Sequence, residues 1–284
     1  MHQARGIRVR IGCHISVAQG FVHAVRQARE LEADGFQYFT KSPRMLRFSR
    51  KLNQADADEG RALQEELGLV SIGHAPYLIN LSAPEDDMRR ASIEALAWDL
   101  EVAAARGSFG VVVHCGKHKG EGVDAGVRRM RESLAIVLEG APNVTLLLEN
   151  TAGQGSEIGS TAEQLLALVD GLAGPERLGF CLDTQHAYAA GELNPEQPDL
   201  LSGFRQPAFM ERLAAVHLND SKVPFGHRAD RHALIGQGHM GREGIRRLLT
   251  APCLQHQPFF LETPVTDENQ YRDEIRLCRE LIMS

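Results

Sequence analysis

The sequence predicts an α/β protein of the (β/α)₈ TIM barrel class, and three observations carry this prediction. Eight short β-rich runs recur along the 284 residues, segments with helical spacing separate them, and several runs are apolar throughout, such as GVVVH and VTLLLE. Continuously apolar strands are typical of a parallel sheet covered on both faces. Because a barrel of this class spends about 250 residues on one domain, we assign residues 1–284 to a single barrel domain. A doubly wound open sheet is the alternative fold.

The predicted strands follow one another at intervals that leave room for a helix in each gap. They span residues 8–14, 36–40, 69–73, 111–114, 144–149, 178–183, 213–218 and 258–262. Between them, the run 22–31 has helical spacing that we expect Gly35 to end. Segments 82–85 and 160–163 have the Ser-x-x-Glu spacing of a capping box, which marks the start of a helix.

Composition excludes several classes of protein. With 43% apolar and 24% charged residues, the chain can bury a full core and is neither disordered nor fibrous. It has no apolar run of the roughly 20 residues that a membrane span requires, so we expect a cytoplasmic protein without a membrane partner. The five cysteines lack a CxxC pair, which argues against both a disulfide framework and a thiolate zinc site.

The net charge of −6 with neutral histidines would ordinarily argue against a polyanionic partner. The 12 histidines weaken that argument, because histidines and carboxylates that bind divalent cations raise the charge by two per ion. Three such ions would bring the net charge to zero.

A side chain that can bind a metal ends strand after strand. These six residues are His74, His114, Glu149, Asp183, His217 and Glu262. The carboxyl ends of the strands in a parallel barrel emerge on one rim, where barrel enzymes place their active sites, so we expect the six side chains to converge. His186, one turn beyond Asp183, and the Asp230 and His232 pair in the long connection 219–241 extend the set to nine.

Taken singly, each of the nine residues has a commoner structural interpretation. A histidine at a strand end is more often hydrogen-bonded than metal-bound, and Glu149 alone could cap a helix. Together they are difficult to explain without cations, because buried carboxylates and imidazoles are costly unless they are paired or bind a metal. Five histidines with four carboxylates favour Zn²⁺ or Mn²⁺ over Mg²⁺ or Ca²⁺. Nine ligands imply two or three ions, and such clusters favour phosphoester hydrolysis.

At this point the chain closely resembles the endonuclease IV family of apurinic/apyrimidinic endonucleases. The matching strings lie in family order along nearly the whole chain. They are FTK (39–41), HAPYLINL (74–81), LENTAGQGSEIG (148–159), DTQHA (183–187), AAG (189–191), HLNDSK (217–222), DRH (230–232) and LET (261–263). Any one of these strings is moderately specific, whereas ENTAGQG, DTxH and HLND-K together are highly specific.

The resemblance implies a barrel that binds three zinc ions, and the ligand types also allow Mn²⁺ at one or more of the sites. Its implied ligand sets are His74, His114 and Glu149 for the first ion; the bridging Glu149 with Asp183, His217 and Glu262 for the second; and His186, Asp230 and His232 for the third.

The implied activity is incision of double-stranded DNA on the 5′ side of an abasic site, leaving a 3′-hydroxyl and a 5′-deoxyribose phosphate. A metal-bound hydroxide would attack the phosphorus, and Glu149 would position it as the catalytic residue. We expect a monomer, because the rim must admit a duplex.

The resemblance also implies DNA contacts on the same rim. Tyr77 and Leu78 match the residues that enter the minor groove, and Arg44 matches an arginine that inserts into the base stack. The structural alternative for Tyr77 and Leu78 is that they cover the core beside the rim. The remaining predicted DNA-binding residues are expected to contact the DNA backbone. They are Lys117, Lys222 and Arg231.

The chain departs from the common family pattern at several positions outside the nine ligands. The loop after FTK reads Ser42 to Leu46 where asparagine and an aromatic are usual, and Cys115 to Lys117 stands where Pro-Gly-Ser is frequent. Gln185 and Gln237 replace a common cysteine and a common glutamate. We therefore expect differences in DNA contacts rather than in the metal ligands.

Two other functions are compatible with parts of the pattern. A sugar isomerase or epimerase on a related barrel would bind divalent metals at the same rim, but such sites use more carboxylates and fewer histidines. A non-catalytic module that binds damaged DNA or stores metal would be expected to have lost a bridging carboxylate, whereas Glu149 and Glu262 are both present.

Overall fold

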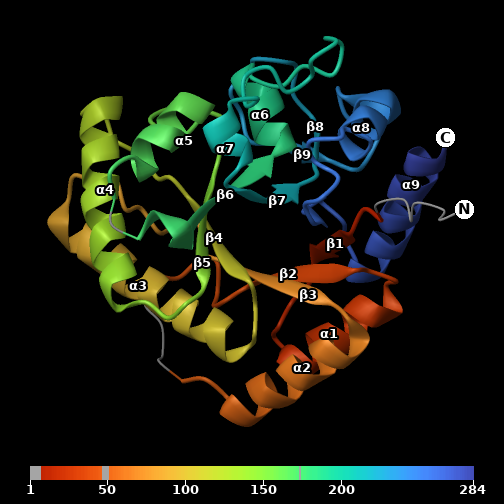
Figure 1. Ribbon diagram of the computed structural model, residues 1–284, viewed down its shortest axis with the longest axis horizontal. Helices are drawn as coiled ribbons and strands as arrows, with labels where there is room; N and C mark the ends of the chain where they lie inside the picture. The colour runs from red at the N-terminus through yellow and green to blue at the C-terminus, as the bar shows by residue number, and fades with distance from the viewer. Residues whose placement is uncertain (1–7, 47–50, 173) are drawn as a thin grey trace, which may run out of the picture.

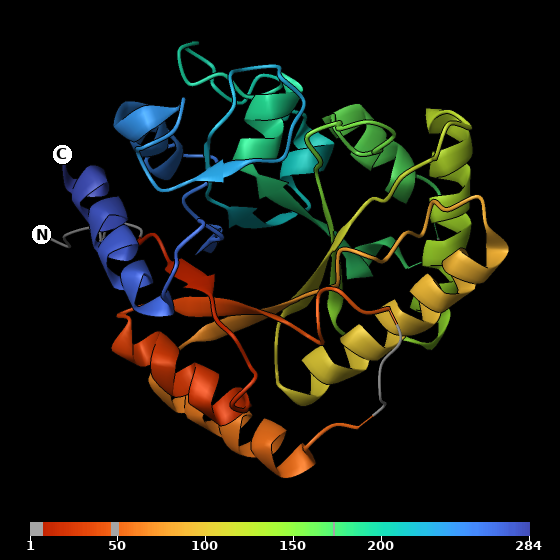
Figure 2. The ribbon, with the colours of Figure 1, turned by 180° about the vertical axis from the view of Figure 1, so that it is seen from behind.

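The computed structural model describes residues 8–46, 51–172 and 174–284, and it confirms the predicted (β/α)₈ barrel class. Eight parallel strands form a closed barrel in the order β1, β10, β7, β6, β5, β4, β3, β2. Their bounds are β1 Ile11–His14, β2 Gly35–Phe39, β3 Val70–His74, β4 Gly110–His114, β5 Thr145–Glu149, β6 Leu178–Asp183, β7 Leu213–His217 and β10 Phe259–Leu261. Figures 1 and 2 show the strands at the centre and the helices around them.

The helices connect successive strands and form the outer layer. They are α1 Phe21–Glu30, α2 Gln54–Leu67, α3 Asp86–Ala105, α4 Val123–Gly140, α5 Ala162–Val169, α6 Thr184–Ala190, α7 Pro207–Met210, α8 Gly241–Leu249 and α9 Tyr271–Met283, with short 3₁₀ turns η1 Pro175–Arg177 and η2 Glu268–Gln270. Neighbouring helices pack in pairs, α1 on α2, α3 on α4 and α8 on α9 (Figure 1). Among the described helices, none is long and apolar enough to span a membrane.

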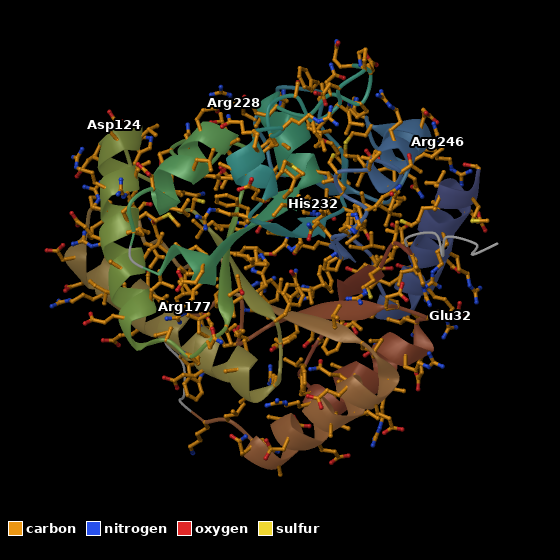
Figure 3. The ribbon with its side chains drawn as sticks, viewed as in Figure 1. Glu32, Asp124, Arg177, Arg228, His232 and Arg246 are labelled. Atoms are coloured by element: carbon orange, nitrogen blue, oxygen red, sulfur yellow. The ribbon has the colours of Figure 1, made fainter. Side chains whose placement is uncertain are left out.

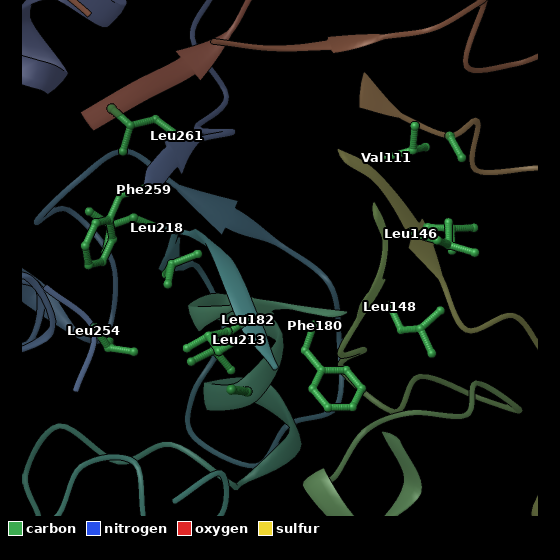
Figure 4. Close-up of a cluster of buried hydrophobic side chains, with 14 of the residues drawn as sticks. Val111, Leu146, Leu148, Phe180, Leu182, Leu213, Leu218, Leu254, Phe259 and Leu261 are labelled. Carbon is green, nitrogen blue, oxygen red and sulfur yellow. The ribbon is translucent and has the colours of Figure 1, made fainter. Parts of the chain in front are cut away.

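Alternation along the strands builds two separate apolar cores, because successive side chains point to opposite faces of a strand. One face packs against the helices, and Figure 4 shows part of this shell, including Leu146, Leu148, Phe180 and Leu182. The other face fills the barrel interior with a smaller cluster, which we call the inner apolar layer. It consists of Ile72, Val112, Leu147, Cys181, Ala215 and Phe260. Side chains therefore fill the barrel interior at this level and leave no open channel through it.

Two glycines make room for this interior at the β1 and β2 side. A side-chain carbon on Gly12 would lie 2.5 Å from the Gly35 carbonyl oxygen and 2.9 Å from the ring of Phe260. The register pairs Gly12 with both Gly35 and Phe260. Close approach of the backbones here lets the Phe260 ring fill the space where β1 and β2 contribute no side chain.

Several local predictions were wrong at element ends. Gly35 does not end the first helix: α1 ends at Glu30, and Gly35 is the first residue of β2. The capping box at 82–85 does not form, because α3 begins after Glu85 and the Ser82 hydroxyl donates to the Cys115 carbonyl at 2.8 Å. At the second segment the cap is one residue later, where Thr161 accepts from the Gln164 amide.

The long connection 219–241 carries a small two-stranded sheet of its own, β8 Asp220–Ser221 and β9 His232–Ala233. The buried Asp220 carboxylate accepts hydrogen bonds from three amides, those of Ser221, Gly238 and Met240, at 2.7 to 3.0 Å. A carboxylate satisfied by several backbone amides fixes a loop in one conformation. The connection is therefore an ordered element that carries side chains toward the barrel rim.

Candidate metal centre

The six side chains predicted to converge occupy one level of the barrel, which we call the rim layer. Each follows a residue of the inner apolar layer by two positions, five of them on the same strand and Glu262 directly after the end of β10: His74 after Ile72, His114 after Val112, Glu149 after Leu147, Asp183 after Cys181, His217 after Ala215 and Glu262 after Phe260. A period of two keeps both members of each pair on the inward face. Polar and charged residues thus begin where the apolar filling stops.

Glu149 lies at the centre of this layer and is completely buried. One carboxylate oxygen, Oε2, is 3.0 Å from Nε2 of His114 and 3.3 Å from Nε2 of His74. The other, Oε1, is 2.9 Å from Nδ1 of His217 and 3.5 Å from Nδ1 of His186. Each oxygen therefore faces a different pair of imidazoles, which is the arrangement of a carboxylate that bridges two sites.

Electrostatics follow from this geometry. Burial disfavours the ionised form of Glu149, but His114 and His217 outweigh burial and hold the pKa of its carboxyl well below the usual range. Burial likewise lowers the pKa of His186, and the opposing effect of Asp183 and Asp230 is larger, so that its pKa is raised well above the usual value. The layer consequently stabilises negative carboxylates beside positive charge.

A second group forms around His217. Its Nδ1 is 3.2 Å from Oε2 of Glu262 and 4.0 Å from Oδ2 of Asp183, in addition to its contact with Glu149. Asp183 has two functions in the fold: its Oδ1 caps α6 by accepting from the His186 amide at 2.7 Å, while its Oδ2 faces the rim layer. A capped helix start thereby fixes the direction of a second carboxylate.

The third group comes from α6 and the connection 219–241. Oδ2 of Asp230 is 3.4 Å from Nε2 of His186, and Oδ1 is 3.3 Å from Nε2 of His232. Nε2 of His232 is also 3.7 Å from Oδ2 of Asp183. Figure 3 shows His232 toward the middle of the barrel, whereas the labelled Asp124 and Glu32 lie at the periphery.

The donor set fits divalent cations. Ligand atoms of His74, His114 and Glu149 lie within 4.8 Å of one another, as do those of Glu149, Asp183, His217 and Glu262, and those of Asp183, His186 and His232. Nε2 of His232 is buried without a hydrogen-bond partner. Neutral imidazoles and carboxylates at such separations suit Zn²⁺ or Mn²⁺. Burial raises the pKa of the nearby Cys181 thiol to about 12, and this side chain belongs to the inner apolar layer.

Amide side chains that sequence analysis did not single out support the rim layer. Asn219 donates from Nδ2 to Oδ2 of Asp183 at 2.7 Å and to Oε2 of Glu262 at 3.3 Å, and its Oδ1 accepts from the Glu262 amide. Asn150 brackets the backbone of Asp183, donating to its carbonyl and accepting from its amide. Both residues lie within the quoted motif strings, so their place in those strings could have identified them from the sequence.

Gln37 and His14 were also missed. Gln37 is fully buried on β2 and contacts His14, His217 and Glu262. His14 ends β1 as the other histidines end their strands, so the rule that selected the six applied to it as well. Burial lowers the pKa of His14 to about 4, which leaves its imidazole neutral.

The predicted DNA-binding residues lie on the outer side of the rim. Tyr77 is 59% exposed and Leu78 is 48% exposed, although the Tyr77 ring packs edge-on against Phe39 at 5.3 Å and lies 5.7 Å from His114. Tyr77 therefore covers the imidazoles and presents its other face to solvent. Arg44 is exposed on the loop after β2.

The three basic residues that are predicted to contact the DNA backbone lie in two loops. Lys222 and Arg231 are exposed neighbours directly beside the β8–β9 sheet, where the Lys222 amide donates to the Arg231 carbonyl at 2.9 Å. Lys117 is exposed and pairs with Glu157 at 3.3 Å. Of the departures from the family pattern, Gln185 is buried and donates to the Ala229 carbonyl at 3.0 Å, which ties α6 to the loop carrying Asp230. Gln237 is exposed.

Comparison with known proteins agrees with the barrel fold. Residues 25–281 match the family model described as xylose isomerase-like TIM barrel, so the chain belongs to that family of barrels. A probable endonuclease 4 from Symbiobacterium thermophilum is 45% identical over 96% of this chain and 100% of its own length. Within the barrel family, the chain belongs to the endonuclease IV proteins.

Solved structures give the same assignment. Endonuclease IV from Thermus thermophilus superposes with a TM-score of 0.85 at 37% identity, over 96% of this chain and 99% of that one. A D-tagatose 3-epimerase-like protein has a TM-score of 0.72 at 19% identity, over 97% of both chains. The second likeness shows a shared barrel only.

Proposed function

We propose that this protein is a DNA repair endonuclease that hydrolyses the phosphodiester 5′ to an abasic site in double-stranded DNA. The products would be a 3′-hydroxyl and a 5′-deoxyribose phosphate. The observation that carries the proposal is the buried Glu149 carboxylate, whose two oxygens face four imidazoles on the rim of the barrel. Membership of the endonuclease IV proteins supports the same reaction.

The nine predicted ligands would hold three zinc ions. His74 and His114 would bind one with Glu149; Asp183, His217 and Glu262 would bind a second with the same carboxylate; and His186, Asp230 and His232 would bind the third. Zinc in such a centre lowers the pKa of water, neutralises charge on the phosphoryl oxygens and stabilises the leaving alkoxide.

The side chains of this protein would do the rest. Glu149, fixed by its imidazole neighbours, would orient the attacking water toward phosphorus. Tyr77 and Leu78 are exposed apolar side chains beside His74 and would enter the minor groove at the lesion, with Arg44 in the base stack. Lys117, Lys222 and Arg231 would contact phosphates. We expect the protein to act as a monomer.

Sugar epimerases share this barrel fold, but the composition of the rim layer favours a nuclease. Three imidazoles accompany three carboxylates in that layer, and the β8–β9 connection adds His232 and Asp230 to it. A site that acts on neutral sugars would gain nothing from exposed Tyr77 and Leu78 beside it. A non-catalytic binding module is disfavoured because Glu149 and Glu262 are both present and buried among histidines.

The test uses a duplex with one tetrahydrofuran abasic analogue, labelled at its 5′ end. Incubation with the protein should yield a single product cut immediately 5′ to the lesion, and a chelator should abolish it until zinc is restored. A product cut on the 3′ side, or the same cut with metal fully removed, would overturn the proposal. Turnover of ketoses with no incision would support an isomerase instead.

A further inference from the structure

Gln185 is a fully buried side chain on α6, at the position where a cysteine is common in the family pattern. Its amide has no access to water, so its donors and its acceptor must find partners within the protein. Those partners lie in the connection 219–241, which carries Asp230 and His232. Figure 1 shows α6 beside β8, the first strand of that connection.

The contacts of the Gln185 amide lie on both sides of Asp230. Its Nε2 donates to the Ala229 carbonyl at 3.0 Å, and its Oε1 accepts from the Arg231 amide at 3.3 Å. A carbonyl only accepts and a backbone amide only donates, so these two partners fix the orientation of the side-chain amide. Its Nε2 also donates to the Ser221 hydroxyl at 3.2 Å. The amide thus uses both of its hydrogens and its oxygen to hold the connection against α6.

These hydrogen bonds fix the backbone at Asp230. The Ala229 carbonyl belongs to the peptide group before Asp230, and the Arg231 amide belongs to the peptide group after it. Because each peptide group is planar, holding both groups fixes the two backbone torsions of Asp230 and the direction in which its side chain leaves the chain. The first peptide group is held a second time, since Oε1 of Gln154 accepts from the Asp230 amide at 3.3 Å.

The carboxylate that is directed in this way lies between two imidazoles. Its Oδ2 is 3.4 Å from Nε2 of His186, and its Oδ1 is 3.3 Å from Nε2 of His232. His186 follows Gln185 directly on α6, so one short helix carries a predicted ligand and the amide that brings Asp230 to that ligand. The geometry of the third predicted metal site therefore depends on how the connection is held against α6.

The common cysteine could not replace this amide. A cysteine side chain is shorter than that of glutamine, and its thiol offers one weak donor and a weak acceptor. It could not contact the Ala229 carbonyl and the Arg231 amide at the same time. The departure from the family pattern at Gln185 therefore concerns a support of the metal site, while the nine ligand positions are unchanged.

We propose that Gln185 is a positioning residue that fixes the peptide groups on both sides of Asp230 and thereby holds its carboxylate opposite His186, ready to bind the third ion. This inference rests on the proposed function for its consequence, whereas the fixed backbone is a property of the chain without metal. A group that is already held in place loses less freedom when it binds. Removal of such an outer partner typically lowers metal affinity by about 10- to 100-fold.

The experiment compares two buried glutamines. Gln185→Met removes the amide at similar volume. Gln64→Met is the matched control, because Gln64 is buried on α2 in the outer layer of helices and donates to the backbone carbonyls of Arg106 and Gly107. Asp230→Asn removes a predicted ligand of the third ion and shows what the loss of that site alone looks like.

Two quantities are measured. In the metal-free chains, hydrogen exchange at the Arg231 amide, followed by NMR, should be about tenfold faster in Gln185→Met than in wild type, because this amide has lost its acceptor. In the zinc-loaded chains, a chelator should remove one of three ions from Gln185→Met at a concentration about 10- to 100-fold lower than from wild type, and should leave the other two in place. Gln64→Met should match wild type in both quantities, and Asp230→Asn should also retain two ions.

Selective loss of one ion distinguishes positioning from a general loss of stability. A variant that is merely less stable would release its three ions together. That result, or zinc retention or exchange at Arg231 equal to that of Gln64→Met, would overturn the inference. If Gln185→Met failed to fold, Gln185→Asn would replace it, because its shorter amide cannot reach both peptide groups. The same selective loss is expected there, and full retention of zinc would overturn the inference.

The outcomes separate this inference from the proposed function. If the wild-type chain bound no zinc, the proposed function would fail, and exchange in the metal-free chains would still decide whether Gln185 fixes the backbone at Asp230. If wild type bound three ions and incised DNA while Gln185→Met behaved as Gln64→Met does, only the role of Gln185 would be wrong.

Discussion

Two adjacent layers inside the same barrel differ in chemistry although the same six strands supply both. The inner apolar layer, which includes Ile72, Leu147 and Phe260, fills the barrel without polar side chains other than the Cys181 thiol. Two residues further along each strand, the rim layer replaces it with imidazoles and carboxylates. The first layer contributes stability through packing and the second concentrates charge that folding alone would disfavour.

This difference predicts that substitutions in the two layers change different properties, stability in one and function in the other. A cavity in the inner layer should lower the free energy of unfolding while leaving the chemistry of folded molecules intact. A neutral substitution of a rim-layer ligand should instead lower incision by the folded protein, because these side chains are the predicted metal ligands. Strand β5 offers both changes two residues apart, at Leu147 and Glu149.

The largest effect is expected from Glu149→Gln, which keeps the shape and removes the bridging charge. Incision of abasic duplex should fall by on the order of 10³-fold, while affinity for that duplex largely survives, because the loop contacts are untouched. Single-turnover incision and fluorescence anisotropy measure the two quantities. An incision rate equal to that of wild type would contradict the role of Glu149.

Leu147→Ala provides the matched change in the inner layer. Leu147 is fully buried, and its side chain occupies the space that a side chain on Gly110 or Gly179 would need. The substitution should cost about 2 to 5 kcal/mol of unfolding free energy. Incision per folded molecule should stay near the wild-type rate, as measured at low temperature alongside urea titration. A collapse of incision with unchanged stability would break the distinction between the layers.

Asn219→Leu should produce a smaller change confined to the rim layer. Its amide supports both Asp183 and Glu262, so removing it should lower zinc affinity by about 10- to 100-fold. Zinc per chain, determined by atomic emission after dialysis against graded chelator, measures this. Asn269→Leu, on the exposed turn η2, is the control and should match wild type. Equal zinc retention in the two variants would count against the role of the Asn219 amide in holding these carboxylates.

Exchange of both Tyr77 and Leu78 for alanine should reduce the preference for abasic over intact duplex by about tenfold, about 1.4 kcal/mol. Zinc content should not change, since neither side chain is a predicted ligand. Ile136→Ala serves as control, because Ile136 is similarly exposed, at 57%, but lies on α4. If the affinity ratio were the same before and after the double exchange, the two side chains would merely cover the rim.

The smallest effect is expected from the two basic residues beside the β8–β9 sheet. Replacing Lys222 and Arg231 by alanine should weaken binding to all duplexes alike and reduce the slope of log affinity against log salt by about two. Arg246→Ala is the control, since Arg246 lies on α8 and pairs with Glu243. A slope unchanged by the double exchange would place the DNA backbone elsewhere.

Sequence alone was sufficient for the barrel and for the convergence of the six strand ends. Those predictions depended on local periodicity and on one geometric rule, that parallel strands end on one rim. The prediction failed at helix starts, because Ser82 uses its hydroxyl for a carbonyl on a different loop instead of a cap. Such choices depend on tertiary contacts that no local spacing contains.

The amides of the site could not be predicted in the same way. Gln37 and its partner His217 are 180 positions apart, and an amide carries no metal-binding signature that would draw attention to it. Only the folded barrel brings β2 opposite β7 and β10. His14 is different, because it ended a predicted strand, and the same rule could have included it among the candidates.

The central claim is that the rim layer binds a cluster of divalent metal ions. It is tested most directly by crystals of the zinc-loaded protein, with diffraction recorded above and below the zinc absorption edge. We expect three anomalous peaks beside Glu149, within bonding distance of the nine predicted side chains. A map without peaks there under saturating zinc, with the same side chains hydrogen-bonded only to one another, would contradict it.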